Sequence, residues 1–563
     1  MLTFPHFEPH FPRSQWTLPA VLEYQAVHRA NHPCLSWLDG GTPLSFAQVN
    51  ARVNRLAHGL RKLGVNKGDM VSILLPNCLE FVFCWFALTK LGAIEVAISD
   101  AYKGSFLAHP LILSKSRILV TNAELAQRVQ DIEGDIPLID TIILVDQPVG
   151  SASAVPPFRD IRIRHYEEFE SDDDTNPAAS VTPQDGAAVL MTSGTTGASK
   201  GVMMPHSQFY FFAEEDVQLA RLTEADVYMT GFPLFHGNAQ FLTVYPCLIV
   251  GAHCVLYPRF SASDWAGRAR RSGATVTNLL GATMAFILAQ PASQDDKAHK
   301  VRRIYAAPLS PDLAVRFTER FGVKEYIDGF GQTEISNVFM TPPDAPRPPG
   351  ASGVLVDQFF EIKLADPDTD EEVPEGKVGE LQVRHKMPGI ISDGYLGMPD
   401  KTIESRRNLW FHTGDGLRRD AEGWYYFVDR VKDALRRRGE NISSFEVESG
   451  VRSHPAVAEC AVVGVRADLE AGEDEILACV VLKAGSSLAP EDLIAWCDEK
   501  LPAFMVPRYI EFLASLPQTA TEKVRKKELR ERGLTASTWD RVAAGCKIAS
   551  ETGKRTPPAG DRK

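Results

Sequence analysis

The sequence contains 563 residues, of which 44% are hydrophobic, and it carries a formal net charge of −12. A chain of this length exceeds one ordinary domain, so it predicts two or more packed units. The negative charge disfavours nucleic acid as a partner and is typical of proteins that handle small molecules. It does not exclude anionic ligands, because phosphates bind to local backbone amides and a few cations.

The cysteines and the apolar runs indicate the compartment. None of the nine cysteines forms a CxxC pair, which favours free, mostly buried thiols in a reducing environment. The N-terminal residues include aromatics and prolines but no continuous apolar core, so they do not resemble a secretory signal. The richest apolar run, residues 81–88, is far shorter than the roughly 20 residues that span a bilayer. We therefore expect a cytoplasmic protein without a transmembrane segment.

The first part of the chain alternates between helical and strand-like patterns. Residues 46–63 and 79–91 have helical spacing, and 71–75, 118–121 and 141–145 are short apolar runs typical of buried strands. This alternation predicts α/β layers. Residues 146–186 are rich in Ser, Pro and Asp, which predicts a loop or a joint between subdomains.

The pattern changes twice further along the chain. From residue 361 onward, short strand-like runs at 361–364, 379–383 and 424–428 predict a smaller β subdomain. A last segment has helices at 444–451 and 490–500 and strands at 461–465 and 477–482, which predicts a small α+β domain. We expect a large domain over 1–431, a mobile C-terminal domain over 432–545 and a disordered tail over 546–563.

A loop suited to phosphate follows the apolar strand at 187–192. Its three glycines let the backbone come close to a ligand, and its five hydroxyls and one lysine can meet phosphate oxygens. It is not a Walker A loop, because Lys200 is followed by Gly201. From composition alone, a flexible surface turn is an equally good interpretation. The candidate ATP-binding residues here are Thr192, Ser193, Gly194, Thr195, Thr196, Gly197 and Lys200.

The order of residues in this loop resembles the signature of the adenylate-forming superfamily of acyl-CoA synthetases, luciferases and peptide-synthetase adenylation domains. A second segment is similar to the aromatic-Gly-x-Thr-Glu motif of that family, and it comprises Phe330, Gly331, Gln332, Thr333 and Glu334. The resemblance implies that Phe330 stacks on adenine. It also implies that Glu334 and Thr195 hold Mg²⁺, an ion that prefers hard oxygen ligands.

Two further motifs resemble the nucleotide-binding parts of the family. Thr413-Gly414-Asp415 implies that Asp415 accepts the ribose hydroxyls, and Arg430 matches the arginine that relatives direct at the nucleotide. Taken alone, Thr-Gly-Asp is an ordinary turn.

The last motifs concern the movement of the C-terminal domain and the second half of the reaction. Lys432 stands at the hinge position of the family, and Arg438, Gly439 and Glu440 match the stretch that lines the tunnel for coenzyme A. Lys523 matches the catalytic lysine, although Glu522 precedes it where relatives usually have Gly.

A histidine lies beside the expected acid pocket. His236 matches a gate between this pocket and the thiol tunnel, and the resemblance gives it a catalytic role. A lone histidine among aromatics is equally compatible with a structural role. The pocket walls are expected around residues 235–240 and 279–284.

These motifs occur in family order over nearly the whole chain. Residues 77–86 and 439–443 look most like carnitine/crotonobetaine–CoA ligase-type enzymes. The resemblance implies a Mg²⁺-dependent ligase that forms an acyl-adenylate from a small carboxylic acid and ATP and passes the acyl group to coenzyme A. An enzyme that loads a carrier protein, a luciferase-like oxidase and an inactive nucleotide-binding relative are the alternatives. Neither the acid nor the oligomeric state follows from the motifs.

Overall fold

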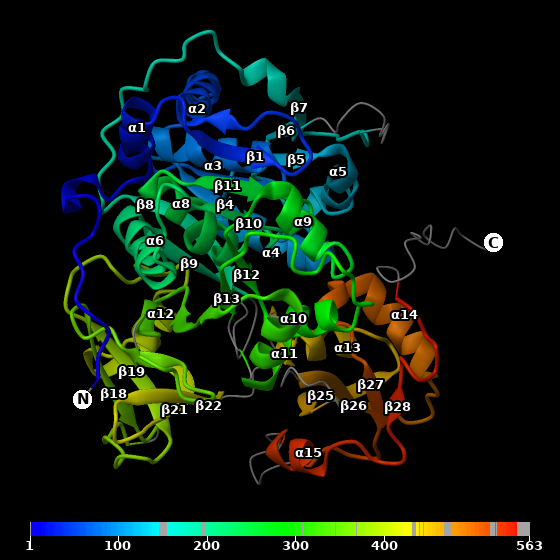
Figure 1. Cartoon of the computed structure of the whole chain (residues 1–563). Coiled ribbons are helices and arrows are strands. Elements are labelled where there is room, and N and C mark those ends of the chain that lie inside the picture. Colours follow the sequence, from blue (N-terminus) through cyan, green and yellow to red (C-terminus); the bar gives the residue numbers. More distant parts are fainter. Residues whose placement is uncertain are drawn as a thin grey trace. The chain divides into compact units, whose positions relative to one another are not determined.

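The computed structural model describes residues 2–145, 155–192, 199–306, 309, 311–343, 345–367, 369–430, 435–437, 440–442, 444–466, 474–517, 524 and 526–548. The chain divides into two compact units (Figure 1). The first comprises Met1–Asp100, Leu107–Thr192 and Lys200–Val431, and the second comprises Ala101–Phe106, Ser193–Ser199 and Lys432–Lys563.

The first sheet of the large unit is mostly parallel and runs in the order β20-β9-β8-β4-β3-β5-β6-β7. Among the described strands of this sheet, the pairs β8–β9 and β9–β20 are antiparallel, so the end of the predicted phosphate loop at Lys200 lies on a strand with antiparallel neighbours on both sides. The bounds are β3 Met70–Leu74, β4 Ile94–Ala97, β5 Ile118–Asn122, β6 Thr141–Val145, β7 Arg162–His165, β8 Gly186–Thr192, β9 Lys200–Pro205 and β20 Gly394–Tyr395.

The helices beside this sheet are placed by local signals. Helix α2 (Phe46–Lys62) begins with a capping box formed by Ser45 and Gln48. Helix α3 (Leu79–Leu91) ends at Gly92, which has a φ of 69°. Every residue of α3 from Phe81 onward is buried, which is typical of a helix that is apolar on all sides. The other helices of this part are α1 Leu18–His28, α4 Gly104–Ser114 and α5 Ala123–Gln130.

A second sheet runs in the order β14-β13-β12-β10-β11-β1-β2 and is parallel except for its edge strand β2. Helix α6 (His206–Ala220) is buried along almost its whole length and contacts β8, β9 and the third sheet at β16. The strands are β1 Pro33–Trp37, β2 Leu44–Ser45, β10 Val227–Thr230, β11 His253–Leu256, β12 Val276–Leu279, β13 Arg303–Ala306 and β14 Glu325–Ile327. The helices are α7 Gly237–Ala239, α8 Tyr245–Val250, α9 Trp265–Ser272, α10 Gly281–Leu288 and α11 Pro311–Phe321.

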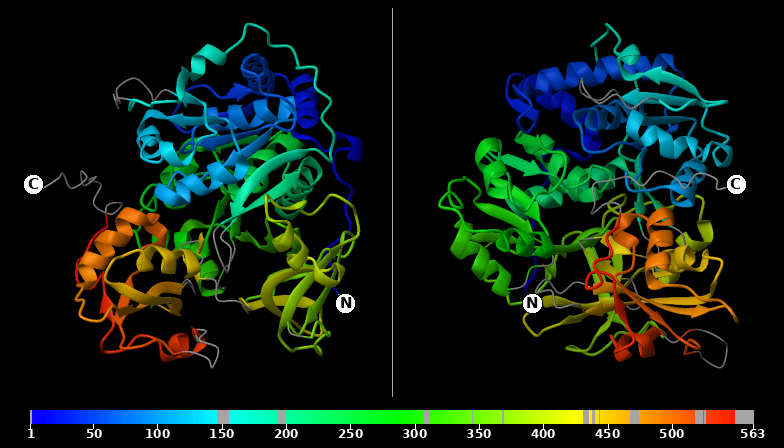
Figure 2. Two further views of the ribbon diagram at one scale, coloured as in Figure 1. Left: turned by 180° about the vertical axis from the view of Figure 1, so that it is seen from behind. Right: turned by 90° about the vertical axis from the view of Figure 1, so that its right-hand side faces the viewer.

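The third sheet is antiparallel and has the order β15-β16-β17-β22-β21-β19-β18. Figure 2 shows β18, β19, β21 and β22 (yellow-green) as a curved part of this sheet. The predicted β subdomain is therefore confirmed. The bounds are β15 Gly329–Gln332, β16 Ser336–Met340, β17 Gly353–Leu355, β18 Phe360–Ala365, β19 Gly379–His385, β21 Phe411–Arg419, β22 Trp424–Arg430 and α12 Pro399–Ser405.

The small unit has its own core. Its sheet has the order β25-β26-β27-β28, and the apolar faces of α13 and α14 contribute to a buried cluster with its strands. Ile548 is buried in this cluster although the tail was expected from residue 546, and residues 549–563 lie outside the described part of the chain. The bounds are β23 Leu435–Arg437, β24 Glu440–Ile442, α13 Ser444–Arg452, β25 Val457–Arg466, β26 Asp474–Leu482, α14 Pro490–Lys500, β27 Tyr509–Phe512, α15 Lys526–Arg532 and β28 Trp539–Asp540.

The prediction that residues 146–186 form a loop is wrong in part, whereas the prediction of free, mostly buried cysteines is confirmed. The expected loop at 146–186 contains strand β7 and a short 3-10 helix at Tyr166–Phe169. Strand β7 lies at the sheet edge and is largely charged, so it lacks the apolar signal of a buried strand. The nine cysteines are free, and seven of them are buried, as expected. Among the described residues, no helix is both long and apolar enough to cross a membrane.

Candidate active site

The predicted metal-binding residue Glu334 lies at the tip of a tight hairpin. Strands β15 and β16 pair antiparallel on either side of it, with Gln332 opposite Ser336. A Cβ atom at Gly331 would lie 2.1 Å from the Ser336 carbonyl oxygen, so only glycine allows the two strands to approach this closely. The backbone amide of Ser392 donates a hydrogen bond to the Glu334 carbonyl oxygen over 2.8 Å. The hairpin tip is therefore fixed by its backbone.

Tyr395 connects Glu334 with the end of the predicted phosphate loop. Its hydroxyl donates a hydrogen bond to Glu334 Oε1 over 3.0 Å, and its ring centroid lies 4.3 Å from Lys200 Nζ. The backbone supports this arrangement, because β20 pairs with β9 and places Tyr395 opposite Val202. A cation and a carboxylate are thus held on one buried aromatic side chain.

The same hairpin also reaches Asp415. The side-chain amide of Gln332 donates hydrogen bonds to Asp415 Oδ2 over 2.5 Å and to the Thr413 carbonyl oxygen over 3.0 Å. Asp415 is 3% exposed and lies opposite Arg430 in the register of β21 and β22. The segment 330–334 is therefore connected to Lys200 through Glu334 and Tyr395, and to Asp415 through Gln332.

Aromatic rings lie on the first part of this motif. The Phe330 ring stacks on Phe427 with centroids 6.1 Å apart and packs at a tilt on Phe339 at 5.9 Å. Phe330 is half-buried, and Phe427 is 42% exposed. Flat aromatic surface of this kind suits a stacked base.

His236 lies in a loop that is held by Asn77. The Asn77 amide donates to the Phe232 carbonyl oxygen over 2.9 Å, and its Oδ1 accepts the Leu234 amide over 2.8 Å. His236 is half-buried and contacts the ring of Phe235 at 5.0 Å between centroids. A π-helix over Gln240–Val244 follows, a feature that is frequent at functional sites.

A buried acid lies behind this loop. Gln240 Nε2 donates to Glu95 Oε1 over 2.9 Å and to the Leu234 carbonyl oxygen over 2.8 Å. Complete burial raises the pKa of Glu95 well above its usual range, and the hydrogen bond from Gln240 opposes this only in part. Burial therefore favours the neutral form of Glu95.

Comparison with known proteins decides the family. The model of the AMP-binding enzyme family matches residues 22–396, and the model of the AMP-binding enzyme C-terminal domain matches residues 446–523. The chain belongs to the AMP-binding enzyme family. It is 33% identical over 493 residues to a crotonobetaine/carnitine–CoA ligase of Salmonella arizonae, which covers 86% of this chain and 93% of the relative.

Two solved structures, of a CoA ligase and a CoA synthetase, resemble most of the chain. An anthranilate–CoA ligase in complex with anthranoyl-AMP matches with a TM-score of 0.68 and 28% identity, covering 95% of this chain and 99% of that one. An o-succinylbenzoate–CoA synthetase of Bacillus subtilis matches with a TM-score of 0.76 and 25% identity over 94% and 99%. The predicted α/β class with a smaller C-terminal domain is confirmed, and the mobility of that domain stays a prediction.

Several predicted site residues of this AMP-binding enzyme lie outside the described residues. They are Ser193, Gly194, Thr195, Thr196, Gly197, Lys432, Arg438, Gly439 and Lys523. Arg430 is the last residue of β22, and Glu440 is the first residue of β24. Thr192 is the last residue of β8, and its hydroxyl lies 3.5 Å from the Lys200 carbonyl oxygen. The roles assigned to all of these residues stay predictions.

Sequence reasoning missed Tyr395 and the acids around residue 412. Tyr395 belongs to no recognised motif, and its link with Glu334 and Lys200 depends on the pairing of β20 with β9. Glu380 and His412 meet only because β19 pairs with β21. Strand β19 alternates apolar residues with Glu380, Gln382 and Arg384, so its sequence carries no signal that singles out Glu380.

Proposed function

We propose that the protein is an ATP-dependent carboxylic acid–CoA ligase that acts through an acyl-adenylate. One observation carries the proposal: the hairpin at 329–340 joins Glu334, through Tyr395, to Lys200 and joins Gln332 to Asp415. A carboxylate that can hold Mg²⁺, a cation that can meet phosphate oxygens and a buried carboxylate that can accept ribose hydroxyls suit a site for ATP. The known family and the CoA ligases among its relatives support the same activity.

In the first step, the substrate carboxylate attacks the α-phosphorus of ATP, an acyl–oxygen–phosphorus bond forms, and pyrophosphate leaves. Lys200 stabilises the negative charge of the phosphates, Asp415 holds the ribose, and Phe330 supports the adenine. Lys523 orients the carboxylate for in-line attack. Mg²⁺ fits the hard carboxylate oxygens of Glu334, with Thr195 as the second protein ligand, and it would neutralise phosphate charge when bound.

In the second step, the thiol of coenzyme A attacks the acyl carbon, a thioester forms, and AMP leaves. Arg438, Gly439 and Glu440 line the approach of the thiol, and Lys432 serves as the hinge between the two steps. His236 gates the path between the acid and the thiol.

The proposed substrate is a small organic acid, and the acids named for similar ligases are the first candidates to test. Carnitine, crotonobetaine, anthranilate and o-succinylbenzoate occur in the names of similar ligases or their ligands. A panel of these acids, with straight-chain acids of short, medium and long length, is tested by ATP–pyrophosphate exchange and by AMP release with and without coenzyme A.

The expected result is acid-dependent exchange and coenzyme A-dependent AMP release. Exchange with acyl transfer only to a carrier protein would instead support a loading enzyme. Light or oxidised product would support a luciferase-like oxidase. Binding of ATP without exchange for any acid would support an inactive relative and contradict the proposal.

A further inference from the structure

A β-bulge in β21 sets the backbone of the predicted ribose-binding residue. The register between β19 and β21 shifts between Glu380 and Gln382, and Gly414 has a φ of 69°. The Asp415 amide donates to Thr413 Oγ1 over 3.1 Å, and that hydroxyl donates to the Leu381 carbonyl oxygen over 2.7 Å. Bulges next to active sites commonly re-aim a side chain. The position of the Asp415 carboxylate therefore depends on what holds this bulge.

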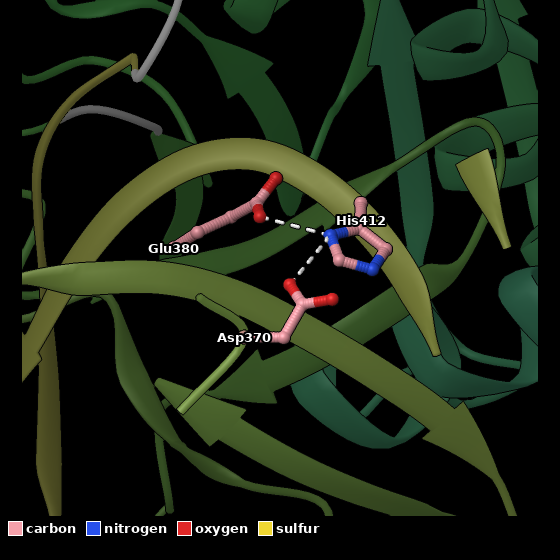
Figure 3. Close-up of side chains that lie close together, drawn as sticks. All are labelled: Asp370, Glu380 and His412. Atoms are coloured by element: carbon pink, nitrogen blue, oxygen red, sulfur yellow. Dashed lines mark hydrogen bonds and ion pairs between the residues drawn. The ribbon is translucent and has the colours of Figure 1, made fainter. Parts of the chain in front are cut away.

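Glu380 holds the bulge with both carboxylate oxygens. Its Oε1 accepts the backbone amide of Gly414 over 3.1 Å, and its Oε2 lies 2.9 Å from Nδ1 of His412 (Figure 3). Burial raises the pKa of Glu380, but the contacts with His412 and Gly414 outweigh it, and the net shift is downward. Glu380 is thus a buried carboxylate whose ionised form is favoured, and it contacts His412 and Gly414 of the bulge.

His412 also contacts Asp370 and Arg407. Its Nδ1 lies 3.9 Å from Asp370 Oδ1, and its Nε2 lies 3.3 Å from the Arg407 carbonyl oxygen. Asp370 accepts hydrogen bonds from Arg407, Gln382 and Asn408. The hydrogen bond from Arg407 is the largest of the influences that lower the pKa of Asp370.

The same three residues offer one ligand atom each within 4.8 Å of one another, as a metal site would. A metal fits them poorly, because the Asp370 oxygens already accept side-chain donors and Glu380 Oε1 accepts the Gly414 amide. The Arg407 guanidinium beside Asp370 adds a further positive charge. The contacts instead resemble a hydrogen-bonded support for the strand.

We propose that Glu380 and His412 are positioning residues that fix Asp415 and thereby set the preference for a ribose over a deoxyribose nucleotide. The proposal rests on the proposed function, in which Asp415 accepts the ribose hydroxyls. Two supports act on Asp415 from different sides: Gln332 at its carboxylate and Glu380 at the neighbouring backbone. Without Glu380, the Gly414 amide loses its acceptor and the bulge can relax, so the carboxylate no longer meets the hydroxyls.

The test compares ATP with 2′-deoxy-ATP and 3′-deoxy-ATP on the full chain. Affinity is measured by calorimetry, which needs no acid, and kcat/KM is measured with an acid that supports exchange. Glu380→Ala and His412→Leu are expected to reduce the preference for ATP by about 10-fold, chiefly through KM. His412→Asn keeps a donor near the position of Nδ1 and is expected to stay within about 3-fold of the unaltered protein.

Matched controls separate positioning from general loss of structure. Glu361→Gln alters an exposed pair with Arg384 in the same sheet and is expected to leave the preference unchanged. Glu380→Met removes both oxygens with little change in volume, so it serves if Glu380→Ala does not fold, with the same expected loss of preference. In an Asp415→Asn background, Glu380→Ala is expected to have no further effect on the preference, because both changes act through one group.

Three results would overturn the proposal. One is equal loss of affinity for ATP and both deoxy analogues in Glu380→Ala and Glu380→Met. Another is additive loss with Asp415→Asn. The third is stoichiometric zinc in the unaltered protein that is lost in His412→Leu, since the cluster would then be a metal site. Failure of every acid in the exchange assay would contradict the proposed function but leaves the calorimetric test intact.

Discussion

Tyr395→Phe isolates the hydrogen bond between Tyr395 and Glu334. The substitution removes the hydroxyl that donates to Glu334 Oε1 over 3.0 Å and keeps the ring 4.3 Å from Lys200 Nζ. A hydrogen bond to a charged group contributes about 1.5–3 kcal/mol, and the half-buried state of Glu334 favours the lower end. A loss of about 1.4 kcal/mol corresponds to a roughly 10-fold lower kcat/KM for ATP.

Two other variants sharpen this prediction. Tyr395→Leu also removes the ring beneath Lys200, and it is expected to cost about 1 kcal/mol more at the nucleotide. Tyr326→Phe is the matched control. Tyr326 lies on strand β14, and its hydroxyl also makes hydrogen bonds, with the Thr318 hydroxyl and the Val323 carbonyl oxygen.

The assay is ATP–pyrophosphate exchange against ATP and Mg²⁺ concentration, with thermal unfolding measured alongside. Tyr395→Phe is expected to raise the Mg²⁺ and ATP requirements while the midpoint of unfolding falls by only a few degrees, and Tyr326→Phe is expected to leave both requirements unchanged. Exchange by Tyr395→Phe at the unaltered rate and the unaltered Mg²⁺ requirement would refute the role of this contact.

Two further predictions rest on particular features of the structure, and a third rests on the lysine that matches the catalytic lysine of the family. Gly331→Ala places a Cβ atom 2.1 Å from the Ser336 carbonyl oxygen, so exchange activity and the unfolding midpoint are both expected to fall, and a variant with unaltered activity would contradict the tight hairpin. Because the pKa of Glu95 is raised, the folded protein keeps a proton that the unfolded chain releases, and the free energy of unfolding falls as pH rises above the ordinary Glu range. Glu95→Gln is expected to remove about 1.4 kcal/mol per pH unit of this slope, measured by denaturant titrations at several pH values. Equal slopes in the two proteins would show that the pKa of Glu95 is not raised. Lys523→Ala is expected to reduce pyrophosphate exchange by about 10²–10³-fold and to spare thioester formation from a supplied acyl-adenylate, whereas unchanged exchange would remove Lys523 from the first step.

Regular elements with a strong apolar pattern could be predicted from the sequence. Helix α3 has the predicted bounds, and β6 coincides with its predicted apolar run. Strand β7 could not be found, because an edge strand that is largely charged carries no apolar signal. The adenylate-forming family is confirmed, since its motifs are local and ordered along the chain.

The contacts that organise the site could not be predicted in the same way. Tyr395 lies far from Glu334 and Lys200 in sequence, and the three meet through the edge pairing of β20 with β9. Glu380 reaches His412 through the register of β19 with β21. Such contacts depend on strand order and on bulges, which no single segment of the sequence specifies.

The formation of an acyl-adenylate is tested most directly with an acid labelled with ¹⁸O in its carboxylate. The proposed attack on the α-phosphorus transfers one labelled oxygen to AMP, and coenzyme A is converted to the acyl thioester in the same reaction. Mass spectrometry is therefore expected to find AMP with one ¹⁸O atom and an equal amount of acyl-CoA. Unlabelled AMP, or ADP with labelled phosphate, would contradict the proposed reaction.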